Sequence, residues 1–339
     1  CLRKGSLVER DRLARLARCW QTNGRLAAQV VERQGSRRGE EEETEIVMSK
    51  LHADYYADRM HQLDVPLVRN EPIAEATYLM RLAVPEIARA VIPGQFVMVR
   101  LSGTDAPLIG RALAVYDVVA DESGNPNWID LVYLRKGTMT TALAQAPLGT
   151  SITVWGPLGN GFANRPCDRL IMVAGGIGQT PMLLLGREAA GLQRYGDPPR
   201  PAGWANRVQL IYGARRSGLL AGVDDFRDAG FDVTLCTDDG SEGQQRLVPE
   251  VLAELLASVP RGERVRVATC GPEIMMEKVA AICQETETDC QVSMETPMAC
   301  GIGICFSCVA QVRQEGPQEW DYKRTCVEGP IFDADQICW

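Results

Sequence analysis

The sequence has very few histidines and no long apolar run, and both shortages narrow the chemistry that it can perform. Its 339 residues include only two histidines, His52 and His61, both in the N-terminal region. Catalysis by a Ser/His/Asp arrangement is therefore not expected. No apolar stretch approaches the roughly 20 residues that a transmembrane helix needs, so no membrane span is expected.

The chain also lacks an excess of positive charge and a visible export signal. Its formal net charge is −8, which argues against nucleic acid as the main partner. No secretory signal peptide is visible near the N-terminus, so the cytoplasm is the expected location. The contents of 45% hydrophobic and 24% charged residues are usual for a globular protein, and the length predicts about two or three domains.

The first 47 residues differ in composition from the rest of the chain. The sequence opens with Cys1, arginines dominate residues 2–38, and residues 40–45 form an acidic run. Apolar periodicity is weak here, so we expect residues 1–47 to be disordered or a non-native N-terminal extension, with Met48 as the natural start. An arginine-rich organelle transit peptide is the alternative, but such peptides contain few acidic residues.

Residues 63–163 predict a small antiparallel β-barrel, because short β patterns alternate there with Gly and Pro turns. One helix is expected inside it, near residues 140–146. The predicted strands are residues 77–82, 95–101, 128–134 and 151–155.

The pattern changes to alternating strands and helices over residues 164–288. Residues 170–174 form a continuous apolar run, as expected for a parallel strand buried on both faces. We therefore expect a doubly wound α/β domain, followed by a small third module at residues 289–339. The other predicted strands are residues 208–212, 233–236 and 264–269, and the predicted helices are residues 181–191, 249–259 and 272–283.

The most specific motif is a group of cysteines in the last module. Cys300, Cys305 and Cys308 have the spacing C-x4-C-x2-C, and Cys326 follows. This is the plant-type ferredoxin spacing for a [2Fe–2S] cluster. Glycines between the first two cysteines permit unusual backbone angles and free N–H groups for the sulfurs. A structural zinc site also uses four thiolates, but it usually has two C-x2-C pairs and this chain has one.

A glycine-rich turn between a predicted strand and helix indicates a site for phosphates. Its sequence, residues 175–181, differs from the Rossmann G-x-G-x-x-G because a proline replaces the third glycine. Residues 269–273 end a later strand, and both turns are expected at the carboxyl edge of the sheet. Cys270 is either a small strand-end residue or a neighbour of a nicotinamide. The candidate dinucleotide-binding residues are Gly175, Gly176, Gly178, Thr180, Pro181, Cys270, Gly271 and Pro272.

The barrel contains three further candidates. Arg111 opens a predicted strand, Gly137 and Thr138 precede the predicted helix, and residues 156–162 form a Gly- and Pro-rich turn at the domain junction. A helix N-terminus can bind an anion. Taken singly, these features are also typical of a surface arginine and an ordinary linker.

Together, in this order, these segments resemble the ferredoxin-reductase superfamily and, more closely, the electron transfer subunits of class B dihydroorotate dehydrogenases. The resemblance extends over about residues 65–337. The stretches that carry it are residues 93–96, 156–162, 175–181, 238–241, 298–308 and 329–334.

This resemblance implies FAD on the barrel, NAD on the α/β domain and a [2Fe–2S] cluster bound by Cys300, Cys305, Cys308 and Cys326. The Arg-Pro-x-Ser flavin motif of the family matches Arg111 to Ala114, where the Arg is retained and both Pro and Ser are Ala. Loss of the Ser hydroxyl removes a hydrogen bond of about 1 kcal/mol, so flavin affinity or potential is expected to differ. The implied FAD-binding residues are Arg111, Ala112, Leu113, Ala114, Val132, Tyr133, Leu134, Gly137 and Thr138.

The resemblance also implies a partner, an FMN-containing dihydroorotate dehydrogenase catalytic subunit, in a heterotetramer with two copies of each chain. Electrons are then expected to pass from dihydroorotate through FMN, the cluster and FAD to NAD+, in the de novo synthesis of UMP. No dihydroorotate site is recognisable in this chain, so it is not expected to oxidise dihydroorotate alone. For the dinucleotide, Asp238 and Asp239 favour NAD, whereas Arg215 and Arg216 favour NADP.

Two other functions fit parts of the sequence. Subunits that exchange electrons between NAD(P)H and ferredoxin, sulfide or hydrogenase partners share the same architecture. A zinc-binding, redox-sensing adaptor is an alternative of another class, and the altered flavin motif leaves room for it. Visible absorption separates the two classes, because a zinc protein without flavin is colourless.

Overall fold

The structure is a computed structural model that describes residues 60–104, 107–315 and 318–339. The predictions for residues 1–47, Met48 and His52 lie outside the described residues. All of the described residues belong to one compact unit. Within them, no helix is long and apolar enough to cross a membrane.

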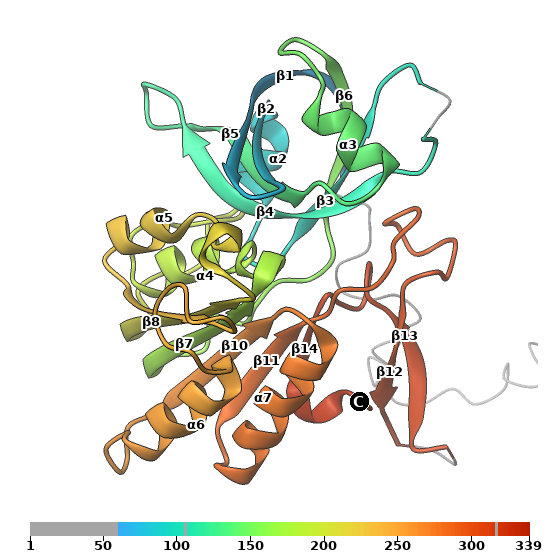
Figure 1. The fold of residues 1–339 in the computed structure, drawn as a ribbon. Helices are drawn as coiled ribbons and strands as arrows, with labels where there is room; N and C mark the ends of the chain where they lie inside the picture. The colour runs from blue at the N-terminus through green and yellow to red at the C-terminus, as the bar shows by residue number, and fades with distance from the viewer. Residues whose placement is uncertain (1–59, 105–106, 316–317) are drawn as a thin grey trace, which may run out of the picture. The chain divides into compact units, whose positions relative to one another are not determined.

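The first part of this unit is a closed antiparallel barrel, as predicted (Figure 1). Its core is built by alternation, since Ile129, Leu131 and Tyr133 of one strand all point inwards and are buried. The strand order is β1-β2-β5-β4-β3-β6. The strands are β1 (His61–Ala74), β2 (Thr77–Ala83), β3 (Phe96–Leu101), β4 (Arg111–Ala120), β5 (Pro126–Leu134) and β6 (Ser151–Leu158).

Two short helices accompany the barrel. Helix α3 (Thr138–Ala144) begins two residues earlier than the predicted segment, because Thr140 forms a capping hydrogen bond with the backbone N–H of Gly137. Helix α2 (Pro85–Ala90) was not predicted from the sequence, although Pro85 stands at its first turn, where proline is favoured. Its Ile87 and Ala88 are buried in the barrel core.

The second part is a six-stranded sheet with the order β14-β11-β10-β7-β8-β9. All neighbours from β11 through β10, β7 and β8 to β9 pair in parallel, and β14 pairs antiparallel to β11 at one edge. Strand β7 is buried along nearly its whole length, as its continuous apolar run predicts. The strands are β7 (Cys167–Gly175), β8 (Ala205–Ala214), β9 (Asp232–Thr237), β10 (Val265–Cys270), β11 (Asp289–Ser293) and β14 (Ile331–Asp333).

Helices cover both faces of this sheet, which confirms the doubly wound prediction (Figure 1). Helix α4 (Met182–Ala189) packs between the sheet and barrel strand β4, near the short helix α5 (Val223–Asp228). Helices α6 (Val248–Ala257) and α7 (Glu273–Glu285) lie on the opposite face. The apolar core is continuous across the two parts, since barrel residues such as Tyr116 and Val132 pack with the sheet residues.

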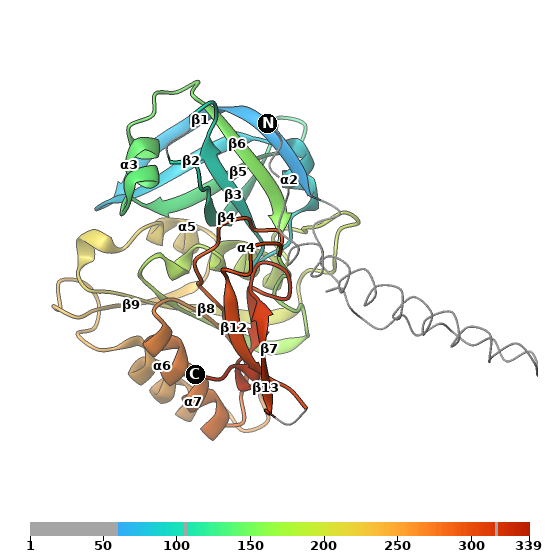
Figure 2. The same cartoon turned by 90° about the vertical axis from the view of Figure 1, so that its right-hand side faces the viewer.

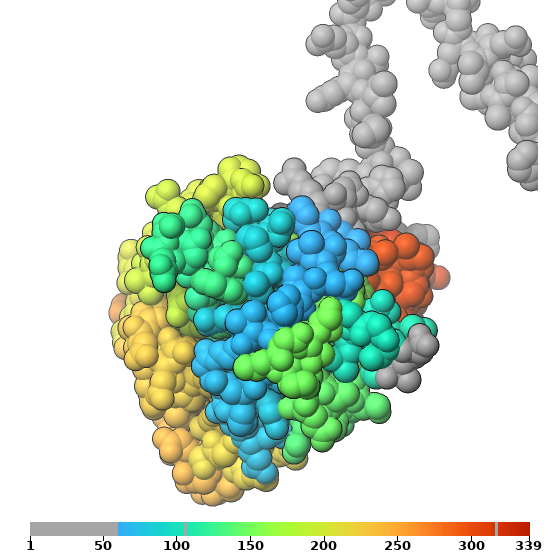
Figure 3. Space-filling model, turned by 90° about the horizontal axis from the view of Figure 1, so that it is seen from above, coloured from blue at the N-terminus to red at the C-terminus, as the bar shows by residue number. Residues whose placement is uncertain are grey.

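The cysteine-bearing segment leaves the sheet and returns to it. It follows β11, forms a hairpin of β12 (Val309–Arg313) and β13 (Trp320–Arg324), and comes back through β14. Figure 2 shows the hairpin in orange and red, with loops that reach the barrel, and in Figure 3 the same segment emerges beside the barrel. A domain boundary near residue 289 stays a prediction, and the structure adds that both ends of this segment pair within the sheet.

Candidate functional site

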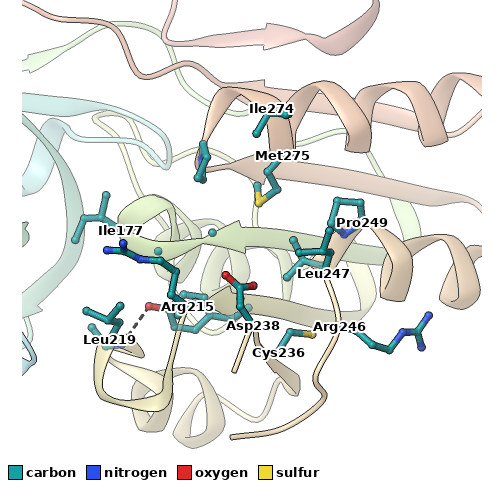
Figure 4. Close-up of a pocket in the computed structure, with 18 of the residues that line it drawn as sticks. Ile177, Arg215, Leu219, Cys236, Asp238, Arg246, Leu247, Pro249, Ile274 and Met275 are labelled. Atoms are coloured by element: carbon teal, nitrogen blue, oxygen red, sulfur yellow. Dashed lines mark hydrogen bonds between the residues drawn. The ribbon is translucent and has the colours of Figure 1, made fainter. Parts of the chain in front are cut away.

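A cavity of about 440 Å³ opens at the carboxyl ends of strands β7 to β10 (Figure 4). This edge is where open α/β sheets bind ligands. The barrel contributes Thr77 and Leu134 to its wall, so the cavity meets the end of barrel strand β5. The wall from the sheet includes Gly175, Gly176, Ile177, Tyr212, Arg215, Cys236, Asp238, Arg246, Pro272, Ile274, Met275 and Lys278.

The glycines of the predicted phosphate turn divide into two roles. Gly176 has a φ of +56°, and a Cβ placed on it would meet no atom within 4 Å, so its backbone faces open space. A Cβ on Gly178 would lie 2.2 Å from the carbonyl oxygen of Cys270. Gly178 therefore allows the turn after β7 to contact the turn after β10, and Gly176 leaves the backbone free for a ligand.

The structure brings the predicted dinucleotide residues together, but only some of them reach the cavity. Gly175, Gly176 and Pro272 line it. Gly178, Thr180, Pro181 and Cys270 are buried and do not line it. A backbone cradle open to phosphates therefore fits a dinucleotide, while the individual contacts stay predictions.

Four charged residues of the cavity were missed or left undecided by the sequence, namely Arg215, Asp238, Arg246 and Lys278. The sequence signal for these residues was weak, because Arg215, Asp238 and Arg246 lie in loops after strands and belong to no recognisable motif. One member of each pair weighed for NAD against NADP has a partner elsewhere. Arg216 donates two hydrogen bonds to Glu75, and Asp239 accepts hydrogen bonds from Ser241. Arg215 and Asp238 remain as the pair that lines the cavity (Figure 4).

The environment of Cys270 disfavours its thiolate form. Its Sγ donates a hydrogen bond to Oε1 of Glu295 at 3.7 Å, and burial raises the pKa of both groups above their usual ranges. A raised thiol pKa means that Cys270 is not an activated nucleophile. The open choice between a strand-end residue and a neighbour of the nicotinamide stays open, since its side chain does not line the cavity.

The predicted flavin residues form a strip on the barrel. Arg111 to Ala114 are four consecutive half-buried residues in β4, and the Arg111 guanidinium donates to the carbonyls of Ile109 and Gly110. The side chains of Val132 and Tyr133 are buried, and the Tyr133 hydroxyl donates to Asn70, so these two residues offer only backbone groups. The half-exposed strip ends at the cavity through Leu134, which fits an extended cofactor such as FAD.

Gly137 and Thr138, the last predicted flavin segment, are exposed at the start of α3. A Cβ on Gly137 would meet no atom within 4 Å. The backbone at this point is therefore accessible to a ligand that lies along the barrel.

The four predicted ligand cysteines lie as two neighbouring pairs, Cys300 with Cys305 and Cys308 with Cys326. Hydrogen bonds from Ser307 lower the pKa of Cys305 to about 6, and the Cys326 thiol lowers the pKa of Cys308 to about 6 while its own pKa is raised. Thiolates are the form that binds metal. Two pairs of thiols suit two irons with two protein ligands each. Among the described residues, no three potential ligands converge as a single metal ion would require.

Backbone geometry in the cysteine loop also fits a cluster. Gly301 and Gly303 have φ angles of +75° and +80°, which favour glycine, and the N–H of Ile302 donates to Sγ of Cys300 at 3.4 Å. The guanidinium of Arg324 donates to the carbonyl of Gly303 at 3.1 Å and is bound by Glu328. The loop is thus shaped by glycines and fixed by a charged residue from the hairpin.

Comparison with known proteins agrees with this geometry. Residues 64–162 match an oxidoreductase FAD-binding domain, and residues 295–338 match the iron–sulfur cluster binding domain of dihydroorotate dehydrogenase B. The dihydroorotate dehydrogenase B (NAD(+)) electron transfer subunit of Desulforamulus reducens is 32% identical over 79% of this chain and 94% of its own length. The chain belongs to this family.

Other relatives agree. The electron transfer subunit of Clostridium perfringens is 33% identical over 72% of this chain and 86% of its own length. A solved structure of an NADH-dependent reduced ferredoxin-NADP oxidoreductase covers 81% of this chain with a TM-score of 0.67 and 24% identity, which shows a shared fold. The chain is therefore an oxidoreductase electron transfer subunit with an FAD-binding barrel and an iron–sulfur module, and the family, the fold and the electron transfer function predicted from the sequence are confirmed.

Proposed function

We propose that this electron transfer subunit passes electrons from the FMN of a dihydroorotate-oxidising catalytic subunit, through a [2Fe–2S] cluster and FAD, to NAD+ in pyrimidine synthesis. The observation that carries the proposal is the position of the two thiol pairs. Cys308 and Cys326 pack against Phe96 and Met98 of the barrel, in one apolar group with Ala112 of the flavin strip. The predicted cluster and flavin sites are thus neighbours.

The chemistry needs both cofactors because a dinucleotide exchanges two electrons as hydride, a [2Fe–2S] cluster exchanges one, and flavin can do both. The chain's own residues bind the cofactors and orient them. Gly176 opens the backbone to the dinucleotide phosphates, and Leu134 and Thr77 bring the barrel to the same cavity. The buried Cys270–Glu295 pair does not line the cavity and supplies no nucleophile.

We propose NAD as the dinucleotide because the carboxylate of Asp238 lines the cavity and would repel a 2′-phosphate. Arg215 lines the same wall, which makes the balance between these two side chains the deciding feature. The names of the relatives, which include NAD(+), support the same choice.

The partner is proposed to cover the exposed tip of the cysteine loop. Ile304 and Phe306 are 69% and 64% exposed there, on either side of the exposed Cys305. Large apolar side chains beside a redox centre are typical of a surface that a second subunit covers. We propose a heterotetramer of two subunits of each kind. The cytoplasm is the proposed location, since ligand thiols need a reducing compartment.

The test is reconstitution of the complex with its catalytic subunit under anaerobic conditions. Flavin, iron and acid-labile sulfide are measured first, and then dihydroorotate-dependent reduction of NAD+. Cys305→Ser is compared with Cys338→Ser, a half-buried cysteine of the same module that lies outside the ligand set. We expect C305S to lose the partner-dependent activity and the iron, and C338S to retain both.

Three results would contradict the proposal. One is a protein without iron and sulfide, another is a C305S complex that still reduces NAD+ at the wild-type rate, and the third is full dihydroorotate oxidation by this chain alone. Reduction of ferredoxin in place of the catalytic subunit would favour the ferredoxin-linked alternative instead.

A further inference from the structure

The first four residues of strand β3 are buried on both faces, although an outer barrel face is usually open to solvent. Val97 and Val99 point into the barrel core, and Phe96 and Met98 on the outer face are only 3% and 0% exposed. The outer pair packs against Cys308, Cys326 and Val327. The cysteine-bearing segment therefore covers the side of the barrel next to the flavin strip.

Trp155 contacts both sides of the junction between the barrel and the cysteine-bearing segment. It stands on the outer face of β6, opposite Met98 in the register, and its indole N–H donates to the carbonyl oxygen of Cys300 at 3.0 Å. Its ring edge fills the space next to Gly110, where a Cβ would lie 2.7 Å from the Trp155 Cη2. Gly110 directly precedes Arg111. One side chain thus contacts the start of the flavin strip and the first predicted cluster ligand.

The loop lies directly on the barrel at the next residue. A Cβ on Gly301 would stand 2.6 Å from Cγ of Met98 and 2.9 Å from Cδ1 of Leu158. No side chain fits between this backbone and the barrel, so the distance between the cysteine loop and the barrel is set by close contact and by the Trp155 hydrogen bond.

Asn160 binds the other half of the module. Its Nδ2 donates to the carbonyls of Ile331 at 2.7 Å and Glu328 at 3.1 Å, and its Oδ1 accepts from the N–H of Ile331 at 2.9 Å. Its backbone N–H donates to the carbonyl of Gly329 at 2.7 Å. This segment directly follows Cys326, so β6 and the turn after it contact the chain next to the first ligand and next to the last.

We propose that Trp155 and Asn160 are positioning residues that fix the cluster-binding module against the flavin-binding face and thereby set the separation between flavin and cluster. The inference rests on the proposed function. Electron transfer rates fall steeply with separation, so a junction that excludes side chains and is hydrogen-bonded at both ends has a direct effect on the rate. Neither residue is a ligand, and each acts through backbone groups of the module.

The test uses the complete chain loaded with FAD and cluster, in the wild type, Trp155→Phe and Asn160→Ala. Trp204→Phe is the matched control, because its indole N–H also donates to a protein acceptor, Glu188, but lies in the α/β domain. Each protein is mixed anaerobically with NADH, and the bleaching of flavin and of cluster is followed separately. Amide hydrogen exchange of the same proteins reports where the module loosens.

We expect the rate of cluster bleaching, divided by the rate of flavin bleaching, to fall about five-fold in W155F and N160A. One net hydrogen bond shifts the equilibrium between the docked and the loosened module by about this factor. Exchange should rise at residues 298–304 in W155F and at residues 326–332 in N160A. W204F should leave the ratio and both segments unchanged.

An unchanged ratio in loaded W155F and N160A would overturn the inference alone. Equal slowing of both phases would overturn it too, since Trp155 would then support the flavin strand rather than the junction. A wild-type protein in which NADH bleaches flavin but no cluster is present would overturn the proposed function together with this inference.

Discussion

Gly176 and Gly178 stand two residues apart in one turn, and the structure predicts opposite consequences when each is replaced by alanine. A Cβ on Gly178 would lie 2.2 Å from the carbonyl oxygen of Cys270 and 2.6 Å from the backbone nitrogen of Gly271. Both are backbone atoms that cannot rotate away. Gly178→Ala must therefore force apart the turns after β7 and β10, with an overpacking cost of about 3 kcal/mol.

Gly176→Ala meets no atom within 4 Å and retains only the strain of a φ of +56°, about 1 kcal/mol. Its methyl group, however, projects at the cavity wall where a phosphate would approach the backbone. We expect it to weaken NADH binding about ten-fold, or ~1.4 kcal/mol, with a small loss of stability.

Urea unfolding followed by circular dichroism measures the first effect, and flavin bleaching as a function of NADH concentration measures the second. Proteins with matched flavin and iron content are compared. If G178A unfolds at the same urea concentration as G176A, the close contact between the two turns is wrong. If G176A binds NADH as tightly as the wild type, Gly176 does not face the dinucleotide.

Three further predictions concern charged groups. Burial raises the pKa of Glu295, so the stability that its neutral form provides is present in acid and is lost as pH rises through the folded-state pKa. Glu295→Gln should remove this loss of stability with rising pH. If the urea midpoints of the two proteins change in parallel with pH, the prediction is wrong. Glu188 has a fully buried side chain that binds Arg200 through two hydrogen bonds of 2.6 Å, so Arg200→Met should lower the free energy of unfolding by about 3 kcal/mol, and a loss below about 1 kcal/mol would refute the pairing. Asp238→Asn should narrow the preference for NADH over NADPH about ten-fold in flavin-reduction kinetics, and an unchanged ratio would place the selection elsewhere.

Local patterns in the sequence were sufficient for most of the fold. The apolar run at residues 170–174 predicted the central strand β7, since a buried parallel strand has apolar side chains on both faces. The spacing of Cys300, Cys305, Cys308 and Cys326 likewise predicted a ligand set; the structure places the four as two neighbouring pairs, and their role as cluster ligands stays a prediction. Both signals are contained within a short window or a known ligand spacing.

Long-range contacts were not predictable in the same way. Nothing near residue 291 or 331 indicates that β11 and β14 extend the sheet, because strand pairing is decided by partners far along the chain. The contact of Trp155 with Cys300 joins residues in different parts of the fold, and so does the meeting of Arg215 and Asp238 at one cavity. Such contacts depend on the register and packing of whole elements.

The return of the chain from β11 to β14 has a mechanical consequence. The cysteine-bearing segment leaves β11 and returns to β14, its neighbour in the same sheet, so both of its ends are held by strand pairing. With both ends held in this way, the arrangement suits a fixed relay, to which the proposed catalytic subunit would bind. To move this segment into another reductase, both of its ends would have to be joined to adjacent strands of that protein's sheet. A flexible tail attached at one end would not reproduce the attachment at both ends.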